Sequence, residues 1–169
     1  SDDPRSEALA AGGDVARRFF ARQPTVVRIG ETVFAHGGVL PSHVEHGLGK
    51  LNAEVGRWME DGRSRGSLKH VKGRDAVVWT RAYSHQDTAR CDCATLQSAL
   101  RMIGARRMVV GHTIQDGGIT QACGGGVLRV DVGLSRGCGD GAPQVLEIIN
   151  DTEVRVLRET NAGARAMGA

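Results

Sequence analysis

The chain has few aromatic residues and no long apolar run. Aromatic residues are 4% of the 169 positions, too few to supply the stacking rings of a nucleic-acid surface. No run of about 18 apolar residues occurs, so no transmembrane helix is expected. Residues 1–5 hold neither an initiator Met nor an apolar signal core, which is expected of a processed chain or a fragment.

Cysteines are scarce, and their spacing does not suit zinc. The four are Cys91, Cys93, Cys123 and Cys138. No CxxC pair occurs among them, so a structural zinc site is not expected. Because no secretory signal is evident, we expect most of these thiols to be reduced and buried, with disulfide pairing as the alternative.

The chain has only a small excess of positive charge. Lys and Arg outnumber Asp and Glu by only 22 to 19, and the basic residues are scattered, so neither nucleic acid nor a membrane is expected as a partner. The glycine clusters at 12–13 and 137–141 follow no strand-to-helix pattern, which argues against a dinucleotide or P-loop site. With 40% hydrophobic residues, the chain is expected to form one domain with its own core.

Strands and helices are expected to alternate along the chain. Hydrophobic residues recur at helical spacing in some segments and form short continuous or alternating runs in others. The expected helices lie within residues 1–23, 42–61 and 93–103. The expected strands are residues 25–29, 32–35, 76–79, 107–111, 118–123, 127–132, 144–149 and 153–157. This order predicts a layered α/β (α+β) fold, and residues 160–169 are expected to be a flexible tail.

Two histidines occur at the ends of expected strands. His36 follows residues 32–35, His112 follows residues 107–111, and glycines come soon after each. A strand holds the side chain at its end rigidly, and glycine lets a ligand approach the backbone. Imidazole is a common ligand of zinc, manganese and iron. The matching settings predict that both rings converge on one metal ion, and the alternative is a pair of hydrogen-bonded structural histidines.

Arg81 and Asp131 are the other candidate site residues. Arg81 follows the apolar run 76–79, where its guanidinium would either clamp a phosphate or form a surface ion pair. Asp131 lies in an apolar strand, where it would either orient a histidine or serve as an acid beside a turn. The remaining histidines, expected to be exposed or in polar loops without a ligand partner, are His43, His46, His70 and His85.

Five short segments carry a resemblance to a known family. They are residues 33–41 (VFAHGGVLP), 51–52 (LN), 79–83 (WTRAY), 109–113 (VVGHT) and 129–135 (RVDVGLS). His36, Arg81 and His112 follow one another at intervals of 45 and 31 residues. In this order the segments resemble the C-terminal half of the phosphoprotein phosphatases, within the calcineurin-like metallophosphoesterases, and most of all the Shewanella-like branch. The resemblance covers residues 24–159, as the C-terminal part of a metallophosphoesterase domain.

The resemblance implies a metal-dependent phosphatase. The family folds as a β-sandwich flanked by helices and binds two divalent metal ions, manganese, iron or zinc, between the sheet edges. By resemblance, His36 and His112 would ligate the same ion, and Arg81 would hold the substrate phosphate. The metals would activate a bridging water for in-line attack on phosphorus. The implied substrate is phosphoserine or phosphothreonine in a protein.

Three motifs of that family are missing from this chain. They are G-D-x-H-G, G-D-x-x-D-R-G and G-N-H-E, which supply the carboxylate, Asn and further His ligands, the proton donor and another phosphate-binding Arg. Asp14 follows a glycine but is not followed by the residues of either Gly-Asp motif. Without hard oxygen ligands, two imidazoles are expected to hold at most one metal ion weakly.

The missing motifs predict an incomplete chain that is inactive by itself. Its expected partners are a phosphorylated protein substrate and the missing N-terminal half of the same fold. Strands that lack their usual neighbours are expected to leave an apolar face or a sheet edge exposed. The alternative is a non-catalytic module that binds a phosphopeptide or a partner protein. Relatives of this type occur in the cytoplasm and in plastids, so the compartment stays open between the two.

Overall fold

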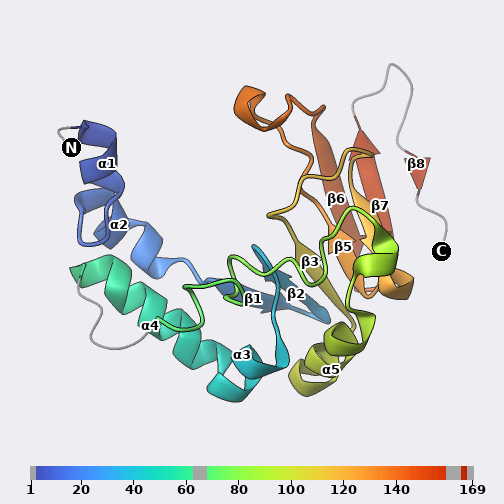
Figure 1. The fold of residues 1–169 in the computed structure, drawn as a ribbon, viewed down its shortest axis with the longest axis horizontal. Coiled ribbons are helices and arrows are strands. Elements are labelled where there is room, and N and C mark those ends of the chain that lie inside the picture. The colour runs from blue at the N-terminus through green and yellow to red at the C-terminus, as the bar shows by residue number, and fades with distance from the viewer. Residues whose placement is uncertain (1–2, 63–67, 159–164, 167–169) are drawn as a thin grey trace.

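The computed structural model describes residues 3–62, 68–158 and 165–166, which form two sheets (Figure 1). The five-stranded sheet has the order β1-β2-β3-β5-β4, and the smaller sheet has the order β6-β7-β8. The strands are β1 Val26–Ile29, β2 Thr32–Ala35, β3 Arg107–Val110, β4 Thr120–Ala122, β5 Val127–Arg129, β6 Gln144–Ile149, β7 Glu153–Arg158 and β8 Arg165–Ala166. In the larger sheet, β2, β3 and β5 are parallel, and the edge strands β1 and β4 are antiparallel to their neighbours.

Helices flank the five-stranded sheet, which confirms the predicted mixed α/β class. The helices are α1 Pro4–Leu9, α2 Asp14–Arg18, α3 Pro41–His46, α4 Leu48–Asp61 and α5 Cys93–Ile103. The 3₁₀ turns are η1 Phe20–Arg22, η2 Thr88–Arg90, η3 Cys123–Gly125 and η4 Arg136–Cys138. In Figure 1, α3, α4 and α5 lie below the larger sheet and the β6–β7 hairpin lies above it. Within the described residues, no helix combines the length and the apolar character that crossing a membrane requires.

The single helix predicted for residues 42–61 is wrong, because the helix is interrupted. Gly47 has a φ of 97° and separates α3 from α4. This backbone conformation is accessible to glycine at little cost. The first of the two helices begins at Pro41, one residue before the expected start at Ser42, because proline suits the first helical position.

The main core lies between the larger sheet and helices α3 to α5. Side chains alternate along a strand, and one face of β2 and β3 is buried against the helices. The strand residues of this core include Val33, Ala35, Met108 and Val110, and the helix residues include Leu51, Val55, Leu96 and Leu100. Complete burial of each such aliphatic side chain stabilises the fold by about 1.5–3 kcal/mol.

Residues 76–79 form turns and not the predicted strand. Both Trp79 and Thr80 donate backbone hydrogen bonds to the carbonyl of Ala76, at 2.9 and 2.8 Å. Ala76 and Val77 are nevertheless buried in the core. Burial therefore explains the apolar run, and a run of four apolar residues does not distinguish a strand from a buried turn.

One cysteine pair contradicts the expectation of reduced thiols. Cys93 and Cys123 form a disulfide with 5.3 Å between their Cα atoms. It joins the start of α5 to the η3 turn. Of the free cysteines, Cys91 is buried as predicted and Cys138 is exposed. The alternative expectation, disulfide pairing, is therefore correct for Cys93 and Cys123.

The N-terminal segment is helical in three short pieces, of which α2 and η1 pack on α4 and α1 packs on α2. In Figure 1, α1 and α2 stand at the end of α4 that is remote from the sheet. The backbone N–H of Gly12 donates to the carbonyl of Met59 at 2.9 Å. At the other end of the chain, most of the tail expected for residues 160–169 lies outside the described residues, and residues 165–166 form β8.

Candidate metal and phosphate site

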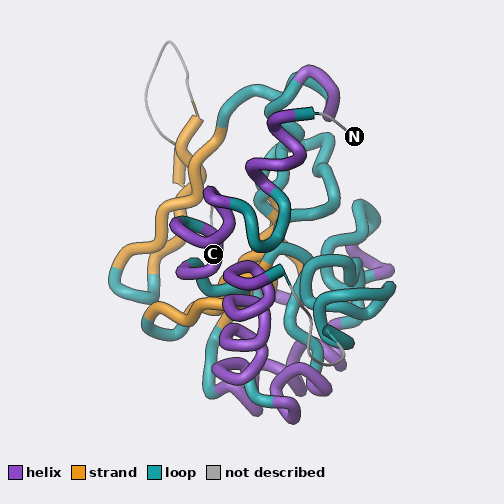
Figure 2. Tube along the Cα trace, turned by 90° about the vertical axis from the view of Figure 1, so that its left-hand side faces the viewer, coloured by secondary structure: helices purple, strands orange, loops and turns teal. Residues whose placement is uncertain are grey.

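Two neighbouring strands bring His36 and His112 together. β2 and β3 are parallel, with Ala35 opposite Val110, so their carboxyl ends meet at the same edge of the sheet. The N–H of Gly111 donates to the carbonyl of His36 at 2.8 Å and extends the pairing by one residue. Each histidine therefore leaves the sheet at the same point. In Figure 2, where loops and turns are teal, they make up a large part of the molecule.

The two imidazoles face each other. Nε2 of His36 lies 3.1 Å from Nδ1 of His112, and the rings are 4.9 Å apart with an interplanar angle of 59°. Two imidazole nitrogens that bind one cation, each at a typical bond length of about 2.0–2.1 Å, are themselves about 3 Å apart. The predicted convergence of the rings is confirmed. The two nitrogens are within hydrogen-bond distance, as the alternative of a hydrogen-bonded pair requires, and the same spacing also fits two ligands of one ion. Their role as metal ligands stays a prediction.

His112 is held in an unusual environment. Its backbone has a φ of 66°, which is uncommon for a residue with a side chain and is typical of functional sites. Trp79 packs edge-on against its ring at 5.3 Å. Nε2 of His112 is buried, and among the described residues it has no hydrogen bond of good geometry, although the Trp79 carbonyl is close enough to affect the pKa of the ring.

Burial disfavours the charged form of the His112 ring. It lowers the pKa of His112 below that of a free imidazole, and the neighbouring charges of Arg81 and His36 lower this pKa further. The Trp79 carbonyl and the carboxylate of Asp131 oppose this shift. The neutral imidazole is the form that binds a metal ion.

Arg81 lies beside this pair, in an open hollow of about 350 Å³. The hollow is lined by Gly73, Arg74, Trp79 and Arg81. Neither Arg74 nor Arg81 forms an ion pair with a carboxylate in the described part of the chain, so the ion-pair alternative for Arg81 is not observed. The hollow adjoins the imidazole pair through Trp79, which contacts the His112 ring. Its two guanidinium groups suit an anion, and arginine is well matched to phosphate.

A buried glutamine ties the loop after Arg81 to the loop after His112. Nε2 of Gln115 donates to the carbonyls of Ser84 and Thr113, both at 2.9 Å. The hydroxyl groups of Ser84 and Thr113 lie 2.7 Å apart. These contacts fix the two loops relative to each other, so the arginine loop is positioned by the histidine loop.

The described residues supply only part of a metal centre. No group of three or more His, Cys, Asp or Glu side chains comes together as a metal site in residues 3–62 and 68–158. The histidine pair thus lacks the oxygen ligands that hard divalent ions prefer. This agrees with the absence of the three acidic and Asn-containing motifs from the sequence.

The chain is similar in sequence to a plant protein phosphatase. It is 44% identical over 155 residues to Shewanella-like protein phosphatase 2 of Arabidopsis thaliana. The alignment covers 90% of this chain and 40% of the plant protein, so the chain spans less than half the length of this relative. No protein-family model matches the chain.

Solved phosphatase structures share the fold. The cold-active protein tyrosine phosphatase of a psychrophilic Shewanella species matches with a TM-score of 0.67 and 20% identity, over 82% of this chain and 41% of that one. A second structure of a cold-active protein tyrosine phosphatase matches with the same TM-score and identity and with 40% of its chain covered. At this identity the likeness shows the fold, and it again covers less than half of the solved protein.

The acid candidate Asp131 stabilises the turn that follows it. Its Oδ1 accepts a hydrogen bond from the N–H of Gly133 at 3.0 Å. Among the described contacts it makes no hydrogen bond to a histidine, and it acts on His112 only through its charge. The alternative of an acid beside a turn therefore holds.

The glycines after His36 are required by protein packing. Their N–H groups, those of Gly37 and Gly38, donate to the carbonyl of Val77 at 2.9 and 3.1 Å. A Cβ on Gly37 would lie 2.9 Å from the carbonyl oxygens of Val77 and Thr80. The expectation that these glycines admit a ligand is therefore wrong, because the 77–80 turn occupies that space.

His43 was expected to be exposed, which is wrong. It is 1% exposed. Its Nδ1 accepts from the N–H of Leu40 at 3.0 Å, and its Nε2 donates to the carbonyl of Asp75 at 2.9 Å. The residue is structural. The short expected loop before α3 gave no sign that its backbone needed a side-chain acceptor.

The sequence analysis missed Arg74 and Gln115. Arg74 lies in a polar stretch just before the expected strand 76–79, and nothing but its positive charge marks it. Gln115 is a single amide in a glycine-containing loop. Both gain their role from loops that meet in space, so local spacing does not reveal them.

Proposed function

We propose that this chain is part of a metal-dependent phosphomonoesterase that acts on phosphoproteins. The observation that carries the proposal is the 3.1 Å approach of His36 Nε2 to His112 Nδ1, beside a hollow lined by Arg74 and Arg81. A pair of imidazole nitrogens can hold a cation, and the guanidinium of Arg81, whose charge acts on His112, can hold a phosphate beside it. The similarity to a named protein phosphatase supports this function.

The residues of the chain divide into two roles. His36 and His112 would hold one divalent ion, manganese, iron or zinc, and a second ion would need ligands from elsewhere. The bound metal supplies Lewis acidity for phosphoryl transfer. Arg81 binds the substrate phosphate, and Arg74 adds a second positive charge at the same hollow. Trp79 covers one edge of the His112 ring and shields it from water.

We propose phosphoserine or phosphothreonine as the substrate group. The hollow is small, about 350 Å³, and Arg81 lies exposed at its surface, so a phosphate on a short side chain reaches the guanidinium. The solved structural neighbours are named tyrosine phosphatases, and phosphotyrosine peptides are therefore the competing substrates in the test below.

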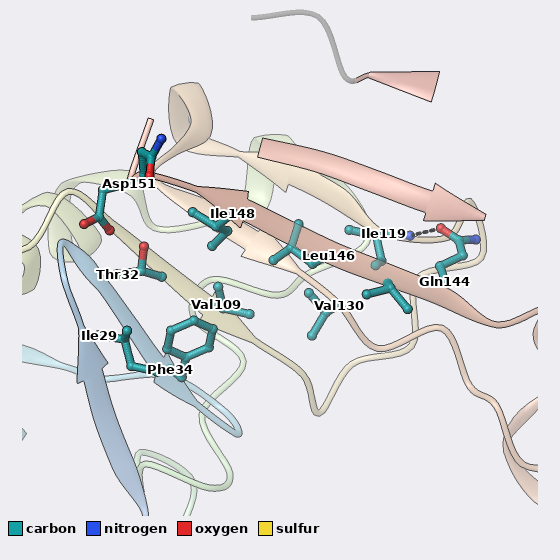
Figure 3. Close-up of a pocket in the computed structure, with 12 residues that line it drawn as sticks. Ile29, Thr32, Phe34, Val109, Ile119, Val130, Gln144, Leu146, Ile148 and Asp151 are labelled. Carbon is teal, nitrogen blue, oxygen red and sulfur yellow. Dashed lines mark hydrogen bonds between the residues drawn. The ribbon is translucent and has the colours of Figure 1, made fainter. Parts of the chain in front are cut away.

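The missing ligands would come from an N-terminal half of the same fold. An apolar groove of about 710 Å³ lies between the two sheets (Figure 3). Its apolar lining includes Ile29, Phe34, Val109, Val130, Leu146 and Ile148. The expected exposed apolar face is thus present. We propose that the missing half packs against this groove and brings the carboxylates to the histidine pair.

Phosphatase assays with manganese test the proposal. We expect this chain alone to hydrolyse neither phosphoserine nor phosphotyrosine peptides, and a longer protein that adds the three missing motifs to hydrolyse the phosphoserine peptide. His112→Ala in the longer protein should lower kcat by at least about 100-fold, because the loss of a metal ligand removes transition-state stabilisation. His85→Ala is the matched control.

Two outcomes would contradict this. Hydrolysis by the 169-residue chain alone would show that a second half is not required. Full activity of the longer protein with His112→Ala would sink the metal-ligand role. A preference for the phosphotyrosine peptide would correct the substrate class.

A non-catalytic phosphopeptide-binding module is the second candidate. The observation that favours it is the combination of two arginines without ion-pair partners and an incomplete metal centre among the described residues. It predicts that this chain binds a phosphoserine peptide without metal and that Arg81→Ala abolishes the binding.

A further inference from the structure

A second cleft, with both polar and apolar lining residues, lies at the opposite end of the central strands. It has a volume of about 650 Å³ and lies between α5, the η3 glycine turn and the β6–β7 turn. Arg107 is the first residue of β3, while His112 follows the other end of the same strand. The cleft is therefore separate from the histidine site.

Arg107 carries a buried positive charge without a matching carboxylate. It is 4% exposed. Its Nη2 donates to the carbonyl of Asp151 at 2.8 Å, and its Nη1 is buried and has no hydrogen-bond partner in the described part of the chain. Arginine is almost never buried unless it is paired, because an unpaired buried charge is costly. The charges of Asp151 and Glu31 act on Arg107, but no described carboxylate is within ion-pair distance of it, so an anion in the cleft would be a closer partner.

Arg106 adds a second charge at the rim. It is exposed and lines the cleft, and no described carboxylate lies within ion-pair distance of it. Burial and the charge of Arg106 lower the pKa of Arg107, with Asp151 and Glu31 opposing this shift. The neighbouring arginine thus contributes to a positive potential.

The one carboxylate that lines the cleft is already engaged. Oε1 of Glu153 lies 2.6 Å from both Nε and Nη2 of Arg155. Its charge is therefore compensated within β7. The net charge that the cleft presents to a ligand is positive.

The rest of the lining suits a small organic molecule. Amide and hydroxyl groups come from Gln97, Gln121 and Thr152. The apolar lining comes from the half-buried Val154 and from the edges of Leu100 and Leu128, which are otherwise buried. Residues 124–126 are glycines, and a Cβ on Gly124 would meet nothing within 4 Å, so this side is open to a ligand. The volume lies within the usual range for small-molecule sites, about 300–1,000 Å³.

We propose that this cleft binds a small phosphomonoester, with its phosphate near Arg106 and Arg107 and its uncharged organic part against the apolar lining around Val154. A phosphate group supplies the negative charge that the two guanidinium groups lack and accepts several of their N–H groups at once. An inorganic phosphate ion satisfies the same charges but leaves the apolar lining unused. We therefore expect it to bind more weakly than a phosphomonoester.

Titrations of the 169-residue chain with adenosine monophosphate, inorganic phosphate and adenosine test this, followed by amide NMR signals. Adenosine monophosphate should shift the signals of residues 124–126, inorganic phosphate should shift them at higher concentration, and adenosine should not. Arg106→Gln should weaken the binding of adenosine monophosphate by at least about tenfold, because it removes a charge-assisted contact. Arg101→Gln, an exposed residue on α5 outside the lining, is the matched control and should bind normally.

Arg81→Ala separates this cleft from the histidine site. Binding at residues 124–126 should be unchanged in that variant. The proposal is overturned if Arg106→Gln binds adenosine monophosphate as well as the unmodified chain does. It is also overturned if Arg81→Ala abolishes the shifts at residues 124–126, or if adenosine alone produces them.

Discussion

His43 is a single buried side chain whose protonation should affect stability. Its contacts require the neutral ring, since Nδ1 accepts from Leu40 and Nε2 donates to Asp75. Burial lowers the pKa of His43, the charges of His70 and His46 lower it further, and the carbonyl and charge of Asp75 oppose the shift. A proton on Nδ1 would break the bond to Leu40.

The sign of the pH effect follows from this lowered pKa. In the unfolded chain the ring protonates near pH 6.5, and in the folded chain it does so at lower pH. The stabilisation is therefore complete above about pH 6.5 and is lost as the pH falls below it. Urea unfolding at pH 7.5 and 5.5 should show a smaller free energy of unfolding at pH 5.5, with a weaker dependence in His43→Gln. Equal pH dependence in both proteins would contradict the assignment to His43.

Residues at strand ends could be predicted from the sequence, and residues in loops that meet only in space could not. His36 and His112 each follow a short apolar run, and parallel neighbouring strands carry both to one edge. Arg74 and Gln115 have no such local marker, because their partners lie on loops distant in sequence. Arg81 acts on the pKa of His112 through its charge, although the strand expected before it is absent, and its role in phosphate binding stays a prediction.

At the scale of elements, one side chain attaches helix α4 to the edge strand β1. Oδ1 of Asn52 accepts from the N–H of Val26 at 2.9 Å, and its Nδ2 donates to the carbonyl of Val26 at 2.8 Å. The amide thus imitates the next strand of a sheet. The loss of both bonds leaves a half-buried backbone N–H unsatisfied, which costs about 1–3 kcal/mol.

Asn52→Ala should therefore lower the free energy of unfolding by about 1–3 kcal/mol in urea titrations. Lys50→Ala on the same helix is exposed and should change it by less than about 0.5 kcal/mol. If both variants unfold at the same urea concentration as the unmodified chain, the amide does not hold β1.

The elements that were predicted well are those with strong local signals. The hairpins β1–β2 and β6–β7 and the helix α5 occur where turn residues and periodicity placed them. The helical pattern after Ser42 gave no sign of the break at Gly47. A glycine within an amphipathic pattern is compatible with a continuous helix and with a helix end. The pairing of Cys93 with Cys123 depends on the packing of α5 against the sheet, which spacing along the chain does not encode.

For the molecule as a whole, the groove between the sheets is the feature that matters most. Ile29 and Val145, which line it, are 64% and 58% exposed. An exposed apolar surface of this kind is typical of an interaction site and favours self-association. The isolated chain should therefore bind the dye ANS and form larger species as its concentration rises.

The double change Ile29→Thr with Val145→Thr tests this consequence. Because both side chains are largely exposed, the free energy of unfolding should change little, while ANS fluorescence and light scattering should fall. Met102→Thr, 45% exposed on α5 and outside the groove, should leave both signals unchanged. In the longer protein the missing half should cover the groove, so ANS binding should be weak before any substitution. Strong ANS binding there would mean that the groove receives some other partner and that the histidine pair obtains its oxygen ligands without contact at this face.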